Sequence, residues 1–411
     1  MNKPLLEQNS RGRPVISLQI KRAATVGYFG SFLIFGLLTA ALGPTLPGLA
    51  GNTHSDLAQI SIVFTAQALG YLLGSLSGGR LFDRLPGHRL LFSVLICMAV
   101  LAIFIPFIPQ LWLLVPVFML LGAMQGSLEV GDNTLLVWLY KDKVGPPMNA
   151  LHFFFGLGAI CSPVIVARTM DSGGDFRWAY WAISLLAVPV AFWLLRLPSP
   201  MGPEGKDAGN QAKINPLLIT LVAVLLFLYV GAEASYGGWI YTYTVRRFSF
   251  AAASMAALLT SAFWGALTVG RLLSIPLAVR LKPSTVLVGD LLGCLLSLGI
   301  IGLWPSSMAA VWAGTLGLGF FMAAFFPTTV TLAGQRMQIT GQISGWFFVG
   351  AGAGGMFLPW LIGQLFETTG PGITITIILL DLLAALAVLG AFLYLAAQPE
   401  PEQLDISQEY N

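Results

Sequence analysis

The sequence is poor in charged residues. Only 9% of its 411 residues are Asp, Glu, Lys or Arg, whereas soluble proteins contain about 25%. Hydrophobic residues make up 56% of the chain, and the mean hydropathy is +0.80. A soluble protein of this length could not bury so much apolar surface. The composition therefore excludes a soluble globular domain and predicts a protein that crosses a membrane several times.

Cysteine and histidine are scarce, with three residues of each. Cys97, Cys161 and Cys294 lie in apolar runs without a disulfide or metal-ligand spacing, so we expect small apolar fillers. No Gly-Lys-Ser/Thr loop is present, which excludes ATP as a direct energy source. An enzyme would need a nucleophile with a base, or a metal cluster, and the sequence shows neither. We expect no enzymatic activity, no metal site and no cofactor.

The chain does contain many apolar runs that meet or exceed the ~20 residues a bilayer requires. Because a chain in lipid must satisfy its own backbone hydrogen bonds, each run is predicted to be a helix. Short polar breaks separate twelve such runs, at about residues 22–50, 56–80, 88–108, 111–139, 147–169, 177–197, 215–244, 251–279, 283–304, 307–333, 339–366 and 372–397.

The distribution of Lys and Arg predicts the orientation. With both termini in the cytoplasm, the opposite side carries only Arg168, Arg177, Arg246 and Arg247 of the 21 basic residues. Since cytoplasmic loops are enriched in Lys and Arg, we predict cytoplasmic termini and a multi-pass protein of the inner (plasma) membrane.

The chain is predicted to divide into two halves. The longest polar break, Pro198–Pro216, has the Pro, Gly and charges of a linker. FFFGLGA at Phe153–Ala159 recurs as FFVGAGA at Phe347–Ala353. Tandem six-helix halves related by an axis along the membrane normal are typical of transporters. We predict an all-α membrane fold with a cytoplasmic tail (1–21), a six-helix bundle (22–197), a linker (198–214), a second bundle (215–397) and a cytoplasmic tail (398–411).

One apolar run, Leu121–Tyr140, carries acidic side chains. Glu129, Asp132 and Asn133 are spaced to share one helix face. A carboxylate in lipid costs about 2.5–3.5 kcal/mol, so this face is predicted to line a water-accessible cavity. Low-dielectric surroundings disfavour a charged carboxylate, which suits Glu129, with Asp132, to bind and release a coupling proton. The alternatives are Na⁺ bound by the ionised pair and purely structural hydrogen bonding.

The loop Gly79–Arg89, GRLFDRLPGHR, resembles the signature loop of the major facilitator superfamily, although Pro86 is an extra residue before Gly87. Asp83 can pair with an Arg across the two halves and so latch the cytoplasmic side. The alternative is that the loop only sets the topology. The predicted gating residues are Gly79, Asp83, Arg84, Arg89 and Arg271.

Four segments resemble one branch of that superfamily, which holds fucose–proton symporters and sodium-dependent glucose transporter-like proteins. They are FGLLTAALGPTLP (35–47), LEVGDN (128–133), LHFFFGLGA (151–159) and LYVGAEASYGGW (228–239). The resemblance implies that Glu129 handles the proton and that Asn133 accompanies it. Gly43 stands where the fucose symporters have a helix-one Asp. His152 and Phe155 replace a Gln and an Asn that contact sugar, which disfavours fucose itself.

The seventh run combines Glu233 with aromatic residues and with Gly237 and Gly238, which can unwind a helix at a transporter gate. Aromatic rings with a carboxylate suit a polyol. We assign Trp239 to the cavity and Tyr243 to an interfacial aromatic belt. The predicted substrate contacts are Asn133, Gln67, His152, Glu233, Tyr236, Trp239, Trp264, Thr328, Gln342 and Trp346. For Gln67, Trp264, Thr328, Gln342 and Trp346 the alternative role is packing between helices. For His152 the alternative is a structural role, and for Trp239 it is the aromatic belt.

Two further acids, Asp290 and Asp381, lie in the ninth and twelfth runs, and we expect structural roles for both. Asp290 is expected to pair with Arg271 near the cytoplasmic face. For Asp381 the sequence indicates no partner.

The sequence predicts a secondary active transporter that imports a small polar solute, with a monosaccharide as the first choice and H⁺ coupled through Glu129. The alternatives are a Na⁺-coupled sugar symporter and a proton-driven drug or metabolite exporter. Phe153–Phe155 and Phe325–Phe326 would suit the greasier cavity of an exporter. The expected partners are the solute and the lipid bilayer, with no nucleic acid, and the expected state is a monomer.

Overall fold

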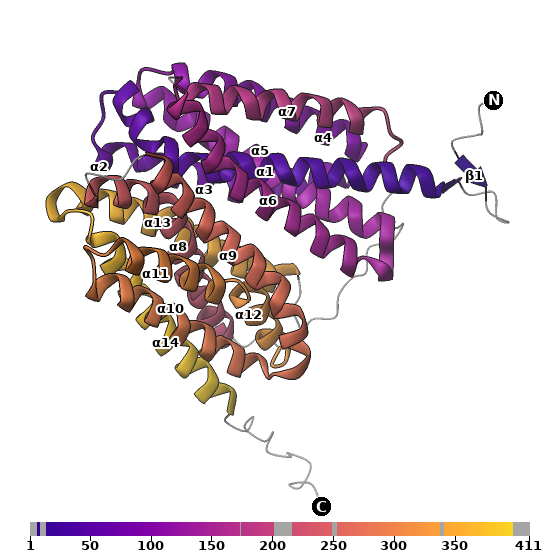
Figure 1. Cartoon of the computed structure of the whole chain (residues 1–411). Coiled ribbons are helices and arrows are strands. Elements are labelled where there is room, and N and C mark those ends of the chain that lie inside the picture. Colours follow the sequence, from indigo (N-terminus) through magenta and orange to yellow (C-terminus); the bar gives the residue numbers. More distant parts are fainter. Residues whose placement is uncertain are drawn as a thin grey trace, which may run out of the picture.

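The computed structural model of the chain describes residues 6–8, 14–172, 174–200, 216–248, 253–337 and 341–397 (Figure 1). Two three-residue strands, β1 (Leu6–Gln8) and β2 (Pro14–Ile16), pair antiparallel ahead of the first helix. In the described ranges the other regular elements are helical, and twelve spans are long and apolar enough to cross a membrane. The predicted number of spans is therefore confirmed. Most of the linker and the C-terminal tail predicted at 398–411 lie outside the described residues.

The helix bounds are close to those predicted from hydropathy. The first half contains α1 (Leu18–Asn52), α2 (Leu57–Ile60), α3 (Ile62–Phe82), α4 (Gly87–Phe104), η1 (Ile105–Phe107), α5 (Leu111–Tyr140), η2 (Lys141–Lys143), α6 (Gly145–Asp171) and α7 (Arg177–Leu195). The second half contains α8 (Pro216–Arg247), α9 (Ala253–Arg280), α10 (Pro283–Leu303), α11 (Met308–Met322), α12 (Phe325–Gly334), α13 (Gly341–Thr369) and α14 (Ile373–Ala397). The tenth span is interrupted between α11 and α12.

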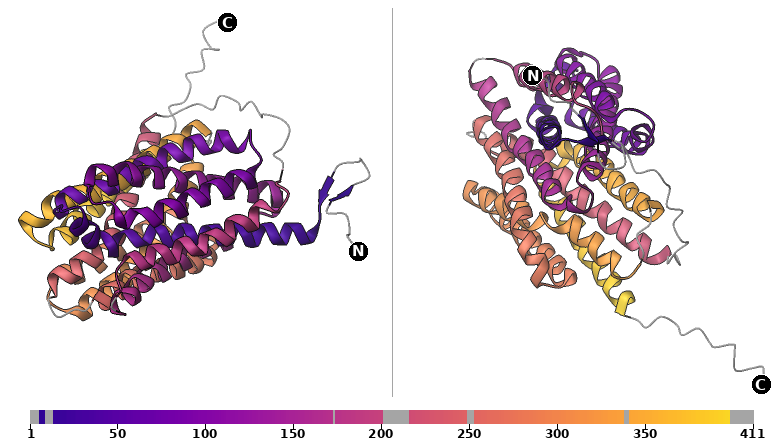
Figure 2. Two further views of the ribbon diagram at one scale, coloured as in Figure 1. Left: turned by 90° about the horizontal axis from the view of Figure 1, so that it is seen from above. Right: turned by 90° about the vertical axis from the view of Figure 1, so that its right-hand side faces the viewer.

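The two halves form two bundles that lie side by side (Figures 1 and 2). In the first bundle α1 packs on α6, α3 on α5 and α4 on α7; in the second, α8 packs on α13, α9 on α11 and α10 on α14. These pairs occupy corresponding places in the two halves, which agrees with the predicted repeat. Because the number of spans is even, α1 begins and α14 ends on one side, here called the terminus face; the opposite side is the distal face.

Small residues bring α3 and α5 together. A Cβ added at Gly122 would collide with the carbonyl oxygen of Gln67, and one at Gly126 with that of Tyr71. Helix packing in lipid depends on van der Waals contact, so such close approach requires residues without side chains. The contact between these helices sets Tyr71 beside Glu129.

Replacing Gly126 with Ala is expected to lower the free energy of unfolding by about 1–3 kcal/mol, because the added methyl group forces α3 and α5 apart. Gly79→Ala is the matched control, since its Cβ would lie 3.8 Å from Val130, an ordinary contact. Thermal unfolding of the two purified variants in detergent measures their stabilities. Equal melting temperatures for the two variants would show that the α3–α5 packing is not this tight.

The bundles contact each other in the distal half of the molecule. Thr65 Oγ1 of α3 donates a hydrogen bond to the Met356 carbonyl of α13 at 3.0 Å, and Gln364 Nε2 donates to the Ala58 carbonyl at 2.8 Å. Ser261 Oγ of α9 donates to the carbonyl of residue 160 at 2.8 Å. The described residues provide no hydrogen bond or ion pair between the bundles in the other half, where they diverge toward the terminus face (Figure 1).

Gly43 lies where α1 meets the backbone of α8. A Cβ added there would lie 2.8 Å from the carbonyl oxygen of Gly237 and 2.9 Å from that of Gly238. Gly238 in turn lies against the ring of Phe64. Absence of a side chain at position 43 thus allows the two bundles to meet through their backbones.

Candidate substrate and ion site

Glu129 lies on α5, beyond the middle of the helix toward the terminus face. Its carboxylate is half-buried, and its Oε2 accepts a hydrogen bond from the hydroxyl of Tyr71 on α3. This single donor leaves the other carboxylate oxygen open to a proton, an ion or a solute. Glu129 therefore lies where α5 meets α3.

Gln125 lies one turn before Glu129 and is buried. Its Nε2 donates to Thr39 Oγ1 of α1 at 3.2 Å, and its Oε1 accepts from Gln67 Nε2 of α3 at 2.8 Å. Gln67, a predicted substrate contact, is half-buried beside it. Two amides and a carboxylate therefore follow one another along the α3–α5 contact near the middle of the membrane span.

Asp132 has different surroundings from Glu129. It is fully buried, and its Oδ2 accepts a hydrogen bond from Ser31 of α1. Its Oδ1 has no partner among the described residues, and neither does the buried Oδ1 of Asn133. Asp132 thus faces α1, whereas Glu129 faces α3, and the two acids share no partner.

Arg271 and Glu233 form an ion pair within the second bundle. Arg271 Nη2 of α9 lies 3.7 Å from Glu233 Oε1 of α8, and the two side chains are 32% and 16% exposed. The Arg271 charge also interacts with Glu129 of α5 and with His152 of α6. Arg271 is therefore paired with an acid of its own bundle, and its charge also acts on Glu129 of the other bundle.

The expected pair between Asp290 and Arg271 is wrong. Asp290 Oδ2 is buried without a hydrogen-bond partner in the described part of the chain. The reason is that α10 packs mainly on α11, α12 and α14 rather than on α9. Asp381 Oδ2 is likewise buried without a partner among the described residues.

Aromatic rings connect the bundles near this site. Trp264 of α9 meets Phe155 of α6 edge-on, with ring centroids 6.3 Å apart. Its Nε1 is buried and has no acceptor among the described residues, so it can donate to a bound solute. His152 is half-buried, and its ring meets Phe32 edge-on at 5.5 Å. The Trp264–Phe155 contact joins the two bundles, whereas the His152–Phe32 contact lies within the first.

Two predicted substrate contacts on α8 are engaged in packing. The Tyr236 hydroxyl shares a hydrogen bond with Thr315 Oγ1 of α11 at 2.7 Å. Trp239 Nε1 donates to the Pro359 carbonyl at 3.0 Å, and its ring lies beside Phe64 of the first bundle. Both side chains are fully buried. Trp239 therefore belongs to the contact that closes the distal half.

The aromatic-belt expectation for Tyr243 is wrong, because the side chain is only 1% exposed. It is enclosed by the protein instead of reaching the headgroups. Thr328 of α12 is half-buried, and Trp346 of α13 is 56% exposed. Neither is brought close to Glu129 by a described contact. The Gln342 side chain lies outside the described residues.

The loop predicted to latch the terminus face forms no latch in this conformation. Asp83, Arg84 and Arg89 are exposed, and their side chains make no ion pair among the described residues. Gly79 lies on α3, near Val130. The bundles diverge at this end of the molecule, so no Arg of the second bundle reaches Asp83.

His88, in the same loop, is buried at the start of α4. Its Nε2 shares a hydrogen bond with the Tyr28 hydroxyl at 2.7 Å, and its Nδ1 lies 2.9 Å from the Leu197 carbonyl. The contacts connect α1, α4 and the end of α7. They give His88 a structural role that the sequence did not indicate.

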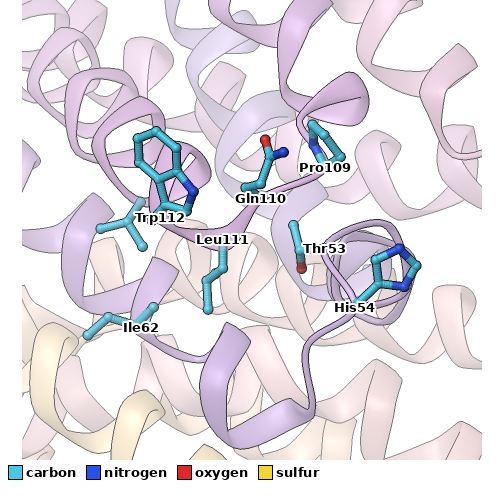
Figure 3. A pocket seen from close by; sticks show the side chains of 8 residues that line it. Thr53, His54, Ile62, Pro109, Gln110, Leu111 and Trp112 are labelled. Atoms are coloured by element: carbon cyan, nitrogen blue, oxygen red, sulfur yellow. The ribbon is translucent and has the colours of Figure 1, made fainter.

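Two cavities lie away from the Glu129 site. One, of about 810 Å³, is formed by the first bundle alone at the distal face (Figure 3), between the α1–α2 turn and the start of α5. The other, of about 200 Å³, lies between the bundles at the distal face and is lined in part by Asp56, Thr242, Arg246 and Glu367. Neither contains a residue of the predicted site.

Comparison with known families decides the class of protein. The model of the Major Facilitator Superfamily matches residues 28–359. The chain belongs to the major facilitator superfamily. It is therefore a multi-pass membrane transporter of small molecules and not an enzyme, as predicted.

Named members of the superfamily are similar over most of the chain. Sodium-dependent glucose transporter 1A of Mus musculus is 30% identical over 375 residues, which cover 82% of this chain and 88% of the relative. Sodium-dependent glucose transporter 1 of Homo sapiens is 31% identical, with 82% and 72% covered. Major facilitator superfamily domain-containing protein 4A of Pongo abelii is 28% identical, with 84% and 87% covered. The predicted resemblance to the glucose transporter-like branch is confirmed.

Solved structures of the superfamily share the fold. The nucleoside transporter NupG superposes with a TM-score of 0.69 at 14% identity, covering 93% of this chain and all of that one. A bacterial homologue of the lysosomal transporter Spinster, in an inward-facing and unoccupied conformation, gives a TM-score of 0.65 at 13% identity, with 92% and 95% covered. The predicted fold of two six-helix bundles is confirmed.

The sequence interpretation missed Tyr71 and Gln125. A signal was present, because Gln67 and Tyr71 are four residues apart, as are Gln125 and Glu129. Polar residues at this spacing share a helix face. The second and the fourth span each carry one such pair, which indicates two polar helix faces that can pack on each other.

Proposed function

We propose that this transporter imports a monosaccharide together with H⁺, and that Glu129 carries the proton. The observation that supports this most directly is the position of Glu129. It is a half-buried carboxylate with one protein donor, Tyr71, in the terminus half of α5 and one turn from the Gln125 amide. An acid held inside a membrane span is by default a functional group.

The surrounding groups suit a sugar. The half-buried Gln67 amide, which donates to Gln125, still offers an acceptor and a second N–H for hydroxyl groups, and Trp264 offers an unpartnered N–H. Aromatic faces pack on the C–H faces of a pyranose. The relatives named as glucose transporters support this substrate class. A drug exporter would need a more apolar site than this polar row provides.

We further propose that the terminus face is cytoplasmic, in the plasma (inner) membrane, and that the protein acts as a monomer. The structure would then be the inward-open state. Solute would enter after the distal contacts, such as Thr65 with Met356 and Gln364 with Ala58, have opened. Such alternation of two bundles around a midplane site is the usual mechanism of this architecture.

Na⁺ coupling is the second candidate, and the names of the sodium-dependent relatives favour it. The described residues contain no group of three or more His, Cys, Asp or Glu that could hold a metal ion. A Na⁺ site would therefore have to combine Glu129, or Asp132 with its unpartnered oxygen, with hydroxyl and carbonyl oxygens.

Uptake of labelled glucose into proteoliposomes tests the proposal, with an imposed pH gradient, an imposed Na⁺ gradient, or neither. We expect concentrative uptake with the inward proton gradient alone. Accumulation driven only by Na⁺ would favour the second candidate. Uptake that neither gradient affects would end the symport proposal.

Replacing Gln125 with Leu is expected to raise the half-saturating sugar concentration roughly ten-fold or more, because a lost hydrogen-bonding group in a buried site costs about 1–3 kcal/mol. The change should leave the dependence on the proton gradient intact, since Glu129 and Tyr71 are retained. Counterflow exchange over a range of glucose concentrations measures the effect. An unchanged half-saturating sugar concentration would show that Gln125 and its partner Gln67 do not belong to the sugar site.

A further inference from the structure

Arg271 is a partly exposed cation of the second bundle whose charge acts on acids of both bundles. It lies 3.7 Å from Glu233, whereas a charge-assisted hydrogen bond is about 2.7–2.9 Å long. Its charge interacts with Glu129 as well, and about one third of its side chain is exposed. Arg271 is therefore held only loosely by its partner in the second bundle.

We infer that Arg271 is a positioning residue for ion coupling, which pairs with Glu233 while the terminus side is open and with Glu129 when that side closes. This inference rests on the proposed role of Glu129 and extends it. An ionised Glu129 attracts Arg271 across the gap between the bundles, and a protonated Glu129 does not. The charge state of Glu129 thereby biases the relative position of the bundles, which is the requirement for coupling two fluxes.

The location of the groups supports such an exchange. Arg271 lies in the terminus half of α9, and Glu129 lies in the terminus half of α5, where the two bundles diverge (Figure 1). Contacts in the distal half, such as Ser261 with the residue 160 carbonyl, keep α9 next to the first bundle. Rotation about this contact would shorten the gap between Arg271 and Glu129. An Arg side chain is long enough to change partners without moving its helix far.

Few other ionisable groups face Arg271 and Glu129. They are Tyr71 on α3, His152 on α6, and Tyr229 with Glu233 on α8. The sequence of α11, which also packs on α9, has no titratable side chain.

Asp132 and His88 lie on the other side of α5 and form hydrogen bonds with other residues. Asp132 faces Ser31 and Tyr28 of α1, and His88 of α4 is bonded to Tyr28. The hydrogen bonds of Asp132 and His88 thus lie within the first bundle.

A distance measurement between the bundles tests the inference without using sugar. Spin labels at positions 137 of α5 and 277 of α9, both exposed in the terminus half, report the opening of that side in liposomes between about pH 5.5 and 8.5. We expect the distance to shorten by several ångström as the pH rises. Arg271→Gln should abolish this shift, and Arg271→Lys should restore part of it.

Arg280→Gln is the matched control. Arg280 is an exposed residue on the same helix and has no ion pair among the described residues, so its variant should shift as the unchanged protein does. If Arg271→Gln does not fold, because Glu233 loses its partner, the double variant Glu233→Gln with Arg271→Gln removes both charges of that pair. It should also lose the shift.

The outcomes separate this inference from the proposed function. A normal pH shift in the Arg271→Gln variant, or none in the unchanged protein, overturns the inference. If Glu129→Gln abolishes proton-driven uptake while Arg271→Gln behaves as the unchanged protein, the inference alone fails. If proton-driven uptake is absent altogether, the proposed function fails with it.

Discussion

Glu129→Gln is expected to abolish concentrative sugar uptake while leaving counterflow exchange. With one proton moved per sugar, a gradient of about two pH units can concentrate the sugar up to about 100-fold, because each unit is worth about a factor of ten. The amide keeps the shape of the side chain and its contact with Tyr71 but cannot carry a proton. The ratio of internal to external labelled glucose in proteoliposomes should therefore fall from that limit to about one.

The matched control for this variant is Asp132→Asn. Asp132→Asn also replaces a carboxylate with an amide on α5, but Asp132 is fully buried against α1. If it is structural, Asp132→Asn retains gradient-driven uptake in whatever fraction of the protein folds. Loss of accumulation in Asp132→Asn, with retention in Glu129→Gln, would move the coupling site from one acid to the other.

Gly43→Leu is expected to prevent closure of the distal face and to lower exchange about 5- to 150-fold. Its side chain would have to occupy the space of the Gly237 and Gly238 carbonyl groups, since even a Cβ would lie 2.8 and 2.9 Å from them. Overpacking of this kind costs about 1–3 kcal/mol in the state that it opposes. The population of the state with a closed distal face would therefore fall about 5- to 150-fold.

Two measurements check the Gly43 variant. Counterflow exchange gives the loss of transport, and the labelling of a cysteine at position 242, which lines the distal cavity, by an impermeant maleimide gives the opening. Gly51→Leu is the control, because it lies on the same helix and has nothing within 4 Å of its added Cβ. Wild-type exchange in Gly43→Leu would show that transport does not require this backbone contact.

The spans could be predicted from the sequence because each depends on a local property, the length of an apolar run. Hydropathy placed the ninth span at 283–304, and the helix α10 covers Pro283–Leu303. The interruption of the tenth span between Met322 and Phe325 was not predicted. Apolar composition is continuous there. The residue that marks the break is Pro327, which cannot donate a hydrogen bond to the carbonyl of residue 323.

The site was less predictable, because its partners come from different helices. The sequence identified Glu129 and Glu233, but it could not show that one faces Tyr71 and the other Arg271. Gly43 illustrates the same limit. In the sequence it indicated only a missing carboxylate, whereas in the structure it is the point where α1 meets the backbone of α8.

The central claim is that sugar and proton move together through Glu129, and sugar-driven proton movement tests it most directly. Proteoliposomes that contain a pH-sensitive dye, with no imposed ion gradient, receive external glucose, and the internal pH is followed. The account predicts acidification of the interior by the unchanged protein and none by Glu129→Gln, although both variants admit sugar. Sugar entry without any change of internal pH in the unchanged protein would contradict it.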